Sequence, residues 1–229
     1  MRIPRLYVPE LNRTVVGLDA GSARRLKKVL RMSDGDRVTL FDGKGLEADA
    51  VLVEDGRQVS ISALRQVEES GPVIHLYPAL IRANRFDWVV EKAVELGARS
   101  IRPVVCERSL IDEAGDRSER WRRLVIEAAE QSGRKLLPEV HPPQRFETAI
   151  AEAAGGVILA WEGEKLATLR EAVQDASELS LFAGPEGGYS DAEVEMGKRA
   201  GATLVTLGPY TLRAETAAII LLGASKLLA

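Results

Sequence analysis

Cysteine and histidine are scarce in this sequence of 229 residues, which has one cysteine, Cys106, and two histidines, His75 and His141. A single cysteine cannot form a disulfide within the chain, and so few ligands cannot build a cysteine-rich zinc site. No Ser-His-Asp arrangement and no set of metal ligands is recognisable along the chain. We therefore expect no metal cofactor, and the composition fits a reducing cytoplasm.

Long hydrophobic runs are also lacking. The amino-terminal stretch MRIPRLYVPELNRTVV has no apolar segment of the signal-peptide kind, and no run of about 18 apolar residues suits a transmembrane helix. The closest candidate, residues 214–229, is interrupted by Glu215, Thr216, Ser225 and Lys226. The sequence predicts a soluble cytoplasmic protein that does not enter membranes.

An excess of positive charge is lacking as well, because the formal net charge is −3. This balance argues against a general nucleic-acid binder. The charges are uneven, however: residues 1–31 hold two acidic side chains and eight basic ones, namely Arg2, Arg5, Arg13, Arg24, Arg25, Lys27, Lys28 and Arg31. One face of this portion could attract phosphates, although a solvated basic helix face explains the same residues.

The pattern of expected strands and helices changes near residue 70. Before it, short strand-like runs such as RVTLFDG and EADAVLV surround one helix expected over 21–31, which indicates a small β-barrel. After QVEESGP at 66–72, apolar strands alternate with helices expected near 84–97, 116–132, 165–176, 190–200 and 213–228. This alternation predicts an α/β domain with a mostly parallel sheet, and domain boundaries of 1–70 and 73–229.

The stretch LFAGPEGGYS at 181–190 places glycines between a strand and a helix, where α/β sheets hold ligands. Ser190 and Glu193 have the capping-box spacing, so the helix should begin at about Asp191. The loop matches neither a Walker A loop nor a dinucleotide fingerprint. Because Glu186 would repel a phosphate, a neutral or cationic ligand is favoured. A tight turn with a solvated glutamate is the alternative.

A second stretch, LGPYTLRAETA at 207–217, also leads from a β-rich run through a Gly-Pro turn into a helix. It would offer backbone groups and the guanidinium of Arg213 to a ligand. The alternative is an ordinary helix start with Glu215 on the favourable end of the dipole. A third stretch, EQSGR at 130–134, is explained simply by a glycine cap with Arg134 near the last carbonyls.

Six stretches in this order resemble the RsmE-type 16S ribosomal RNA (uridine-N3)-methyltransferases of the SPOUT superfamily. They are MRIPRLYVP, VLRM…GD…LFDGKG at 29–45, EKAVELGARSIRPVVCERS at 91–109, EQSGR…PEV at 130–140, GPEGG at 184–188 and LGPYTLRAETA at 207–217. The resemblance implies a PUA-like β-barrel that binds RNA, followed by a SPOUT domain with a trefoil knot. It also implies a homodimer that acts on the small ribosomal subunit.

The same resemblance implies S-adenosylmethionine as cofactor, whose sulfonium cation is compatible with Glu186. By position, the expected cofactor contacts are Leu159, Ala160, Phe182, Gly184, Pro185, Glu186, Gly187, Leu207, Gly208, Pro209, Leu212, Ala214 and Thr216. The expected RNA contacts are Arg2, Arg5, Arg25, Lys28, Arg31 and Arg134. Tyr210-Thr211 departs from the family, which commonly has Arg-Ile or Arg-Val there, and Tyr210 could replace an ionic contact by base stacking.

Transfer of a methyl group to uracil N3 requires loss of the N3 proton and stabilisation of the resulting negative charge. We expect Arg213 to stabilise that charge and either Glu215 or a water to accept the proton, while a structural Glu215 is an equal alternative. Two other functions stay open: ribose 2′-O methylation of RNA, and an RNA-binding or ribosome-assembly protein without catalysis.

Overall fold

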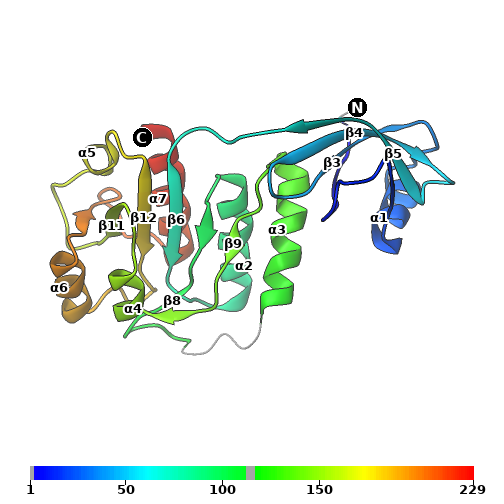
Figure 1. Ribbon diagram of the computed structural model, residues 1–229. Helices are drawn as coiled ribbons and strands as arrows, with labels where there is room; N and C mark the ends of the chain where they lie inside the picture. Colours follow the sequence, from blue (N-terminus) through cyan, green and yellow to red (C-terminus); the bar gives the residue numbers. More distant parts are fainter. Residues whose placement is uncertain (1–2, 112–116) are drawn as a thin grey trace. The chain divides into compact units, whose positions relative to one another are not determined.

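The structure is a computed structural model that describes residues 3–111 and 117–229 (Figure 1). The chain divides into two compact units. Unit 1 comprises Met1–Glu69 and Ala129–Leu137, and unit 2 comprises Ser70–Ala128 and Pro138–Ala229. Residues 129–137 were expected in the C-terminal domain, but they belong to the same compact unit as the N-terminal residues.

Unit 1 contains a curled five-stranded sheet in the order β1-β3-β4-β5-β2 (Figure 1). Neighbouring strands are antiparallel, apart from the parallel pair β1 and β3. Alternate side chains such as Leu6, Leu40 and Leu52 point into one buried apolar cluster, as expected for a half-buried sheet. The strands are Arg5–Tyr7 (β1), Val15–Gly17 (β2), Arg37–Phe41 (β3), Leu46–Val53 (β4) and Gln58–Gln66 (β5).

The helix of unit 1 lies close to its predicted place but changes its winding along its length. It begins as α1 (Ala20–Arg24) and continues as a wider π-helical turn, η1 (Arg25–Val29). The Asp19 side chain caps its start by accepting hydrogen bonds from the backbone N–H groups of Gly21 and Ser22, at 2.8 and 3.0 Å. Hydrogen bonds from the Ser22 hydroxyl and backbone lower the pKa of Asp19.

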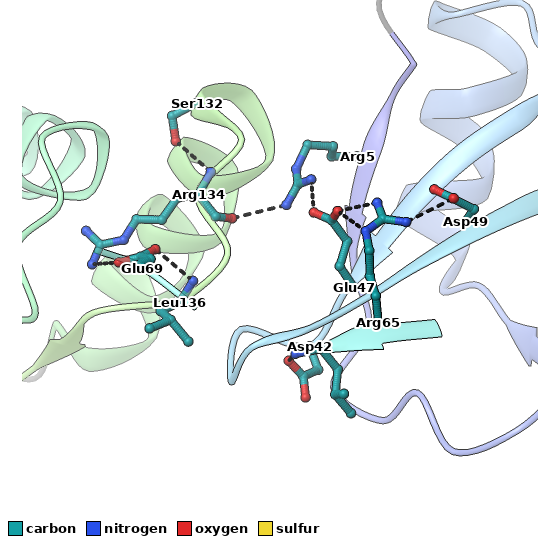
Figure 2. A network of polar contacts seen from close by, with 10 residues as sticks. Arg5, Asp42, Glu47, Asp49, Arg65, Glu69, Ser132, Arg134 and Leu136 are labelled. Atoms are coloured by element: carbon teal, nitrogen blue, oxygen red, sulfur yellow. Dashed lines mark hydrogen bonds and ion pairs between the residues drawn. The ribbon is translucent and has the colours of Figure 1, made fainter. Parts of the chain in front are cut away.

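Glu47 lies at the centre of an ion-pair network in unit 1 (Figure 2). Its carboxylate accepts hydrogen bonds from the guanidinium groups of Arg5 and Arg65, and Arg65 also donates to Asp49 at 2.9 Å. Burial on its own would raise the pKa of Glu47, but the hydrogen bonds from Arg5 and then Arg65 outweigh it and lower the pKa below its ordinary value.

Residues 129–137 pack into unit 1 through several polar contacts. Arg5 donates to the backbone carbonyl of Arg134 at 3.3 Å, and the Arg134 side chain lies 3.4 Å from a Glu69 carboxylate oxygen (Figure 2). The backbone N–H of Tyr7 donates to Glu130 at 3.0 Å, which also forms an ion pair with Arg25. These contacts explain why a segment from the middle of the chain belongs to the N-terminal unit.

The network gives a prediction for unit 1. Glu47→Gln should lower its free energy of unfolding at pH 7 by about 2 kcal/mol, because Arg5 and Arg65 lose a charged acceptor in a buried place. The folded-state pKa of Glu47 is depressed, so this stability is present above its unfolded pKa. It is lost as the pH falls through the folded pKa, where the variant and the native protein should converge.

Circular dichroism during urea unfolding at several pH values measures this difference. The unfolding transition followed by tryptophan fluorescence should be nearly the same for the variant and the native protein, because Trp88, Trp121 and Trp161 all belong to unit 2. The exposed Glu10 supplies the control variant, Glu10→Gln. A Glu47→Gln difference that persists unchanged at low pH would contradict an ionic origin.

Unit 2 contains a six-stranded sheet in the order β13-β11-β12-β6-β7-β9, in which neighbouring strands are parallel. This confirms the predicted α/β architecture with a parallel sheet. The strands of this sheet are Val73–Pro78 (β6), Ser100–Ile101 (β7), Glu139–Val140 (β9), Gly156–Ala160 (β11), Glu178–Ala183 (β12) and Thr203–Val205 (β13). A separate parallel pair joins Val104–Val105 (β8) and Gln144–Arg145 (β10).

Both faces of this sheet are covered. Tyr77 and Phe182, on neighbouring strands, stack at 4.3 Å and join a cluster with side chains of α4 and α6. The alternate residues Leu76, Leu181 and Ile158 point the other way and are also fully buried. The helices are Ala83–Glu95 (α2), Ser118–Ser132 (α3), Phe146–Ala151 (α4), Leu169–Val173 (α5), Asp191–Arg199 (α6) and Ala214–Leu228 (α7).

Most predicted helices occur at the expected places. The helix expected over 165–176 is reduced to α5, because residues 161–167 form turns that are tied to the end of β13 by a hydrogen bond from Thr206 N–H to the Ala167 carbonyl. The short helix α4 was not predicted. Within the described part of the chain, no helix combines the length and apolarity needed to span a bilayer.

Candidate functional site: a pocket at the strand ends

A pocket opens in unit 2 where β11, β12 and β13 end and α7 begins. Three loops form its walls: the loop after β11, the GPEGG loop after β12, and the loop between β13 and α7. Its position at the carboxyl ends of parallel strands is where α/β sheets bind ligands. It is lined by Ala160, Trp161, Glu162, Lys165, Gly184, Pro185, Glu186, Gly188, Thr206, Leu207, Gly208, Pro209, Tyr210, Thr211, Leu212, Ala214 and Ala217.

The GPEGG loop is stabilised by a turn of its own backbone and by close packing against Tyr189. The backbone N–H of Gly188 donates to the Pro185 carbonyl at 3.0 Å, which closes a turn around Glu186. A Cβ atom at Gly184 would lie only 3.0 Å from the buried ring of Tyr189, so glycine allows the loop to approach that ring. Gly188 adopts a φ of 69°, a conformation that favours glycine.

The outer side of the same loop is held by residues 107 and 108. The Arg108 guanidinium donates to the backbone carbonyls of Gly187 and Tyr189 at 3.4 and 3.3 Å. Glu193 accepts hydrogen bonds from the backbone N–H groups of Glu107 and Ser190, at 2.8 and 2.9 Å. The second bond belongs to the capping box of α6, which the sequence predicted and the structure confirms.

The loop between β13 and α7 is set by Thr206 and Gly208. The Thr206 hydroxyl donates to the Gly208 carbonyl and accepts from the Gly208 backbone N–H, both at 3.2 Å. Gly208 has a φ of 120°, which other residues rarely adopt. Beyond it, Tyr210 lines the pocket although the residue is 83% exposed. An aromatic ring therefore stands at the mouth of the pocket.

The loop after β11 contributes an aromatic side chain and charged ones. The ring of Trp161 lies against Gly163, where a Cβ atom would overlap it. The Lys165 ammonium group donates to the carbonyl of Glu162 at 2.6 Å. Lys165 and Glu162 both line the pocket, so this wall brings a cation and a carboxylate to it.

A guanidinium lies between two carboxylates beside the pocket. Arg85, in the first turn of α2, has Nη1 at 3.7 Å from Glu186 Oε1 and Nε at 3.7 Å from Glu215 Oε1. Glu186 was expected to repel a phosphate, and Arg85 offsets part of its charge. The preference for a neutral or cationic ligand therefore rests on the carboxylates of Glu162 and Glu186, whose charge Lys165 and Arg85 offset in part.

Most of the residues predicted to bind a cofactor line this pocket. They are Ala160, Gly184, Pro185, Glu186, Leu207, Gly208, Pro209, Leu212 and Ala214. Leu159 and Phe182 are fully buried in the apolar cluster beneath it. Gly187 faces Arg108, and Thr216 lies in the first turn of α7. Cofactor contact stays a prediction for all thirteen residues, for those that line the pocket as well as for these four.

The two residues predicted for the chemistry differ in exposure. Arg213 is the N-cap residue of α7 and is exposed, with an extended backbone and no capping hydrogen bond from its side chain. The Glu215 side chain is 9% exposed, and its Oε2 atom is buried with no hydrogen-bond partner among the described residues. Unpaired buried carboxylate oxygens are costly, so this atom suggests a partner supplied from outside the chain, or a compensating charge nearby.

The residues predicted to contact RNA also separate into groups. Lys28 and Arg31 are exposed in unit 1, and no ion pair is recorded for them within residues 3–111 and 117–229. Arg25 is exposed but paired with Glu130. Arg5 and Arg134 are mostly buried in the network around Glu47 and Glu69, so phosphate contact by them would require breaking those bonds. Arg2 lies outside the described residues.

Two other reactive side chains are structural. Burial raises the pKa of the Cys106 thiol strongly, which keeps it protonated and agrees with the interpretation as a buried thiol. His75 lies 2.7 Å from the Ser100 hydroxyl and 3.2 Å from Glu178, a row that the sequence did not reveal. Ser100 is buried at the start of β7, away from the strand ends that form the pocket, so its hydroxyl cannot reach a substrate there.

Sequence reasoning missed Arg85 and Arg108. Both approach the pocket loops from elements that come much earlier in the chain, α2 and the turn after β8. No local pattern marks them, because an arginine in a first helical turn or in a polar turn is ordinary. The six-stretch resemblance included Arg108 within EKAVELGARSIRPVVCERS, but it gave the residue no role.

Comparisons with known proteins agree with this geometry. A family model described as an RNA methyltransferase domain matches residues 68–226, and an RNA methyltransferase PUA domain matches residues 26–63. The chain is 31% identical over 215 residues to ribosomal RNA small subunit methyltransferase E of Synechocystis sp., covering 90% of this chain and 71% of the relative. It is 32% identical over 235 residues to the protein of that name from Mycobacterium tuberculosis, covering 95% and 89%.

A solved structure is similar over almost the whole length. The crystal structure of a ribosomal RNA small subunit methyltransferase E from Neisseria gonorrhoeae, bound to S-adenosyl methionine, superposes with a TM-score of 0.88 at 32% identity. The match covers 99% of this chain and 98% of the other. The likeness therefore includes both the N-terminal sheet and the domain that carries the pocket.

Proposed function

Since this chain belongs to the RNA methyltransferase family that includes ribosomal RNA small subunit methyltransferase E, we propose that it methylates N3 of a uridine in 16S ribosomal RNA. The methyl donor is S-adenosylmethionine, which the similar protein from Neisseria gonorrhoeae binds. The observation that carries the proposal is the convergence of three strand-end loops in one pocket.

The residues of the pocket fit S-adenosylmethionine. This cofactor has no phosphate and carries a sulfonium cation, and the lining offers the carboxylates of Glu162 and Glu186. Glycines in two of the three walls bring backbone groups to the pocket, while Leu207, Pro209 and Leu212 supply apolar contacts for an adenine ring. A phosphate-bearing cofactor would be repelled by these two carboxylates, because its negative charge has the same sign as theirs.

Arg213 is the residue that we propose for stabilising charge on the uracil. When bound, S-adenosylmethionine supplies an electrophilic methyl group. Uracil N3 becomes nucleophilic only as it loses its proton, and the negative charge then spreads to the flanking carbonyl oxygens. The guanidinium of Arg213, at the start of α7 and beside the pocket residue Leu212, can donate hydrogen bonds to such an oxygen.

The burial of Glu215 bears on which group accepts the proton from uracil N3. Its Oε2 atom is inaccessible and its Oε1 atom faces Arg85, so direct proton transfer would need the side chain to rotate. A water molecule that passes the N3 proton on to bulk solvent would avoid that movement, and we propose this route for the proton. Proton acceptance by Glu215 stays a prediction.

RNA binding is proposed for the exposed cations of unit 1 and for Tyr210. Lys28 and Arg31 are positioned to contact phosphates, which fixes the RNA without reading its sequence. The target base must leave its stack to enter the pocket. The exposed ring of Tyr210 at the pocket mouth can stack on that base, in place of the cation common in the family.

We further propose that the active form is a homodimer, in which exposed apolar side chains become buried. Trp88 on α2 and Ile220 and Leu227 on α7 are exposed, and α2 and α7 pack together. Exposed large apolar side chains on two helices that pack together favour an interface on this side of unit 2. The trefoil knot and a cytoplasmic location, both implied by the resemblance, stay predictions.

Incubation with labelled S-adenosylmethionine and small ribosomal subunits that lack the modification tests the function. Digestion of the RNA and nucleoside mass spectrometry should detect 3-methyluridine at one position. A methyl group on a ribose 2′-oxygen would overturn the uridine N3 assignment in favour of ribose methylation. Absence of transfer, together with absence of cofactor binding in calorimetry, would favour a non-catalytic RNA-binding protein.

A further inference from the structure

Arg85 has contacts that the proposed reaction does not use. It belongs to α2, whereas the two carboxylates that it faces belong to the GPEGG loop and to the first turn of α7. Both elements line the pocket, through Glu186 of the loop and through Ala214 and Ala217 of α7. A single guanidinium therefore connects two pocket walls that are otherwise separate stretches of chain.

The charges explain why such a connection is needed. Glu186 and Glu215 carry like charges, and their side chains are only 23% and 9% exposed, so water screens their repulsion poorly. Arg85 lies at 3.7 Å from each of them, through different nitrogen atoms. The planar fork of an arginine can face two carboxylates at once, which the point charge of a lysine does less well.

The burial of the three side chains differs in a graded way. Glu215 is the most buried of the three, Glu186 is 23% exposed and lines the pocket, and Arg85, placed between the two carboxylates, is the most exposed at 35%. Glu215 is fixed within the first turn of a 15-residue helix, where the helix dipole also favours its charge. Glu215, Arg85 and Glu186 thus form a row of three charged side chains. Glu215 is its rigid end, and Glu186 is the end that meets a ligand.

We propose that Arg85 is a positioning residue: anchored by Glu215, it holds Glu186 and the GPEGG loop in the conformation that binds the cofactor. The inference rests on the proposed function, because it concerns the same pocket. Arg85 needs no contact with the substrate in this role. Its removal should leave two carboxylates facing each other across the pocket wall and allow the loop to move away.

The sign of the change in cofactor affinity distinguishes positioning from simple charge balance. If Arg85 merely neutralised Glu186, Arg85→Gln would make the pocket more negative and tighten binding of the cationic S-adenosylmethionine. If it positions the loop, the same variant should weaken binding by about tenfold. Positioning also predicts weaker binding of S-adenosylhomocysteine, whose sulfur is neutral, whereas charge balance predicts little change in the affinity for that ligand.

The test is calorimetric titration with S-adenosylmethionine and with S-adenosylhomocysteine. The proteins compared are the native protein, Arg85→Gln, Arg85→Lys, Glu215→Gln and the double variant Arg85→Gln/Glu215→Gln. We expect Arg85→Lys to recover part of the affinity, and the double variant to lose no more than Arg85→Gln alone, because both changes break one row. The turnover number of Arg85→Gln at saturating cofactor should stay within about threefold of the native value. Arg170→Gln, on the exposed side of α5, is the control variant.

Tighter binding by Arg85→Gln, additive losses in the double variant, or a loss confined to turnover would each overturn the positioning role. A melting temperature close to the native one shows that Arg85→Gln is folded, and Arg85→Lys provides the comparison if it is not. Failure of the proposed function is a separate result, because it would appear as absence of cofactor binding by the native protein itself.

Discussion

Arg213→Ala should lower the turnover number about 100-fold or more while changing the affinity for S-adenosylmethionine by less than about threefold. The expectation follows from the place of Arg213. It is exposed at the start of α7, next to the pocket residues Leu212 and Ala214, and it makes no capping bond to the helix. A group that acts only on charge developing in the transition state affects the rate and not the binding of the ground state.

The chain supplies a matched control for this variant. Arg145 is also an exposed N-cap residue, with a φ of −66° and a ψ of 149° against −67° and 151° for Arg213, and it too makes no capping hydrogen bond. Arg145→Ala therefore makes the same chemical change at the start of α4 and should leave turnover unchanged. Single-turnover rates and calorimetric affinities for both variants are needed. Near-normal turnover of Arg213→Ala would assign charge stabilisation to another group.

Gly208→Ala should weaken binding of S-adenosylmethionine more than about tenfold, equivalent to about 1.4 kcal/mol. At a φ of 120°, an alanine at this position would force the backbone to change. The change would spread to Pro209 and Leu212, which form one wall of the pocket, and it would disturb the reciprocal bonds between Thr206 and Gly208. The predicted result is a folded protein with a misplaced wall.

Gly201→Ala is the control for backbone strain. Gly201 follows α6 with a φ of 81°, and like Gly208 it has open space where a Cβ atom would be placed. Both variants should lose a comparable free energy of unfolding, roughly 1–3 kcal/mol, but only Gly208→Ala should lose cofactor affinity. Equal affinities for the two variants would mean that the loop from 206 to 212 does not form the cofactor site.

The parts of the site that could be predicted from the sequence are those set by local chemistry. Neighbouring residues determine the Gly-Pro turns after β12 and β13 and the capping box of Ser190 and Glu193. The structure has these features at the predicted places. Alternating apolar runs and helical patterns likewise predicted the parallel sheet. Its strand ends then bring the two glycine-containing loops together, because parallel strands share one carboxyl edge.

The parts that could not be predicted depend on partners that are distant in the chain. Arg85 belongs to the site because it forms ion pairs with Glu186 and Glu215, and Arg134 forms an ion pair with Glu69 within unit 1. A basic side chain in isolation is read as a surface charge, which is why Arg5 and Arg134 were predicted to contact RNA. The short helix α4 was missed for a related reason: six residues without a side-chain cap carry too weak a local signal.

Amide hydrogen exchange of the native protein, with and without saturating S-adenosylmethionine, tests most directly whether the three strand-end loops form the cofactor site. The account predicts slower exchange in residues 160–165, 184–188 and 206–212, with unit 1 unchanged. Protection confined to other segments, at a cofactor concentration that calorimetry shows to be saturating, would contradict it.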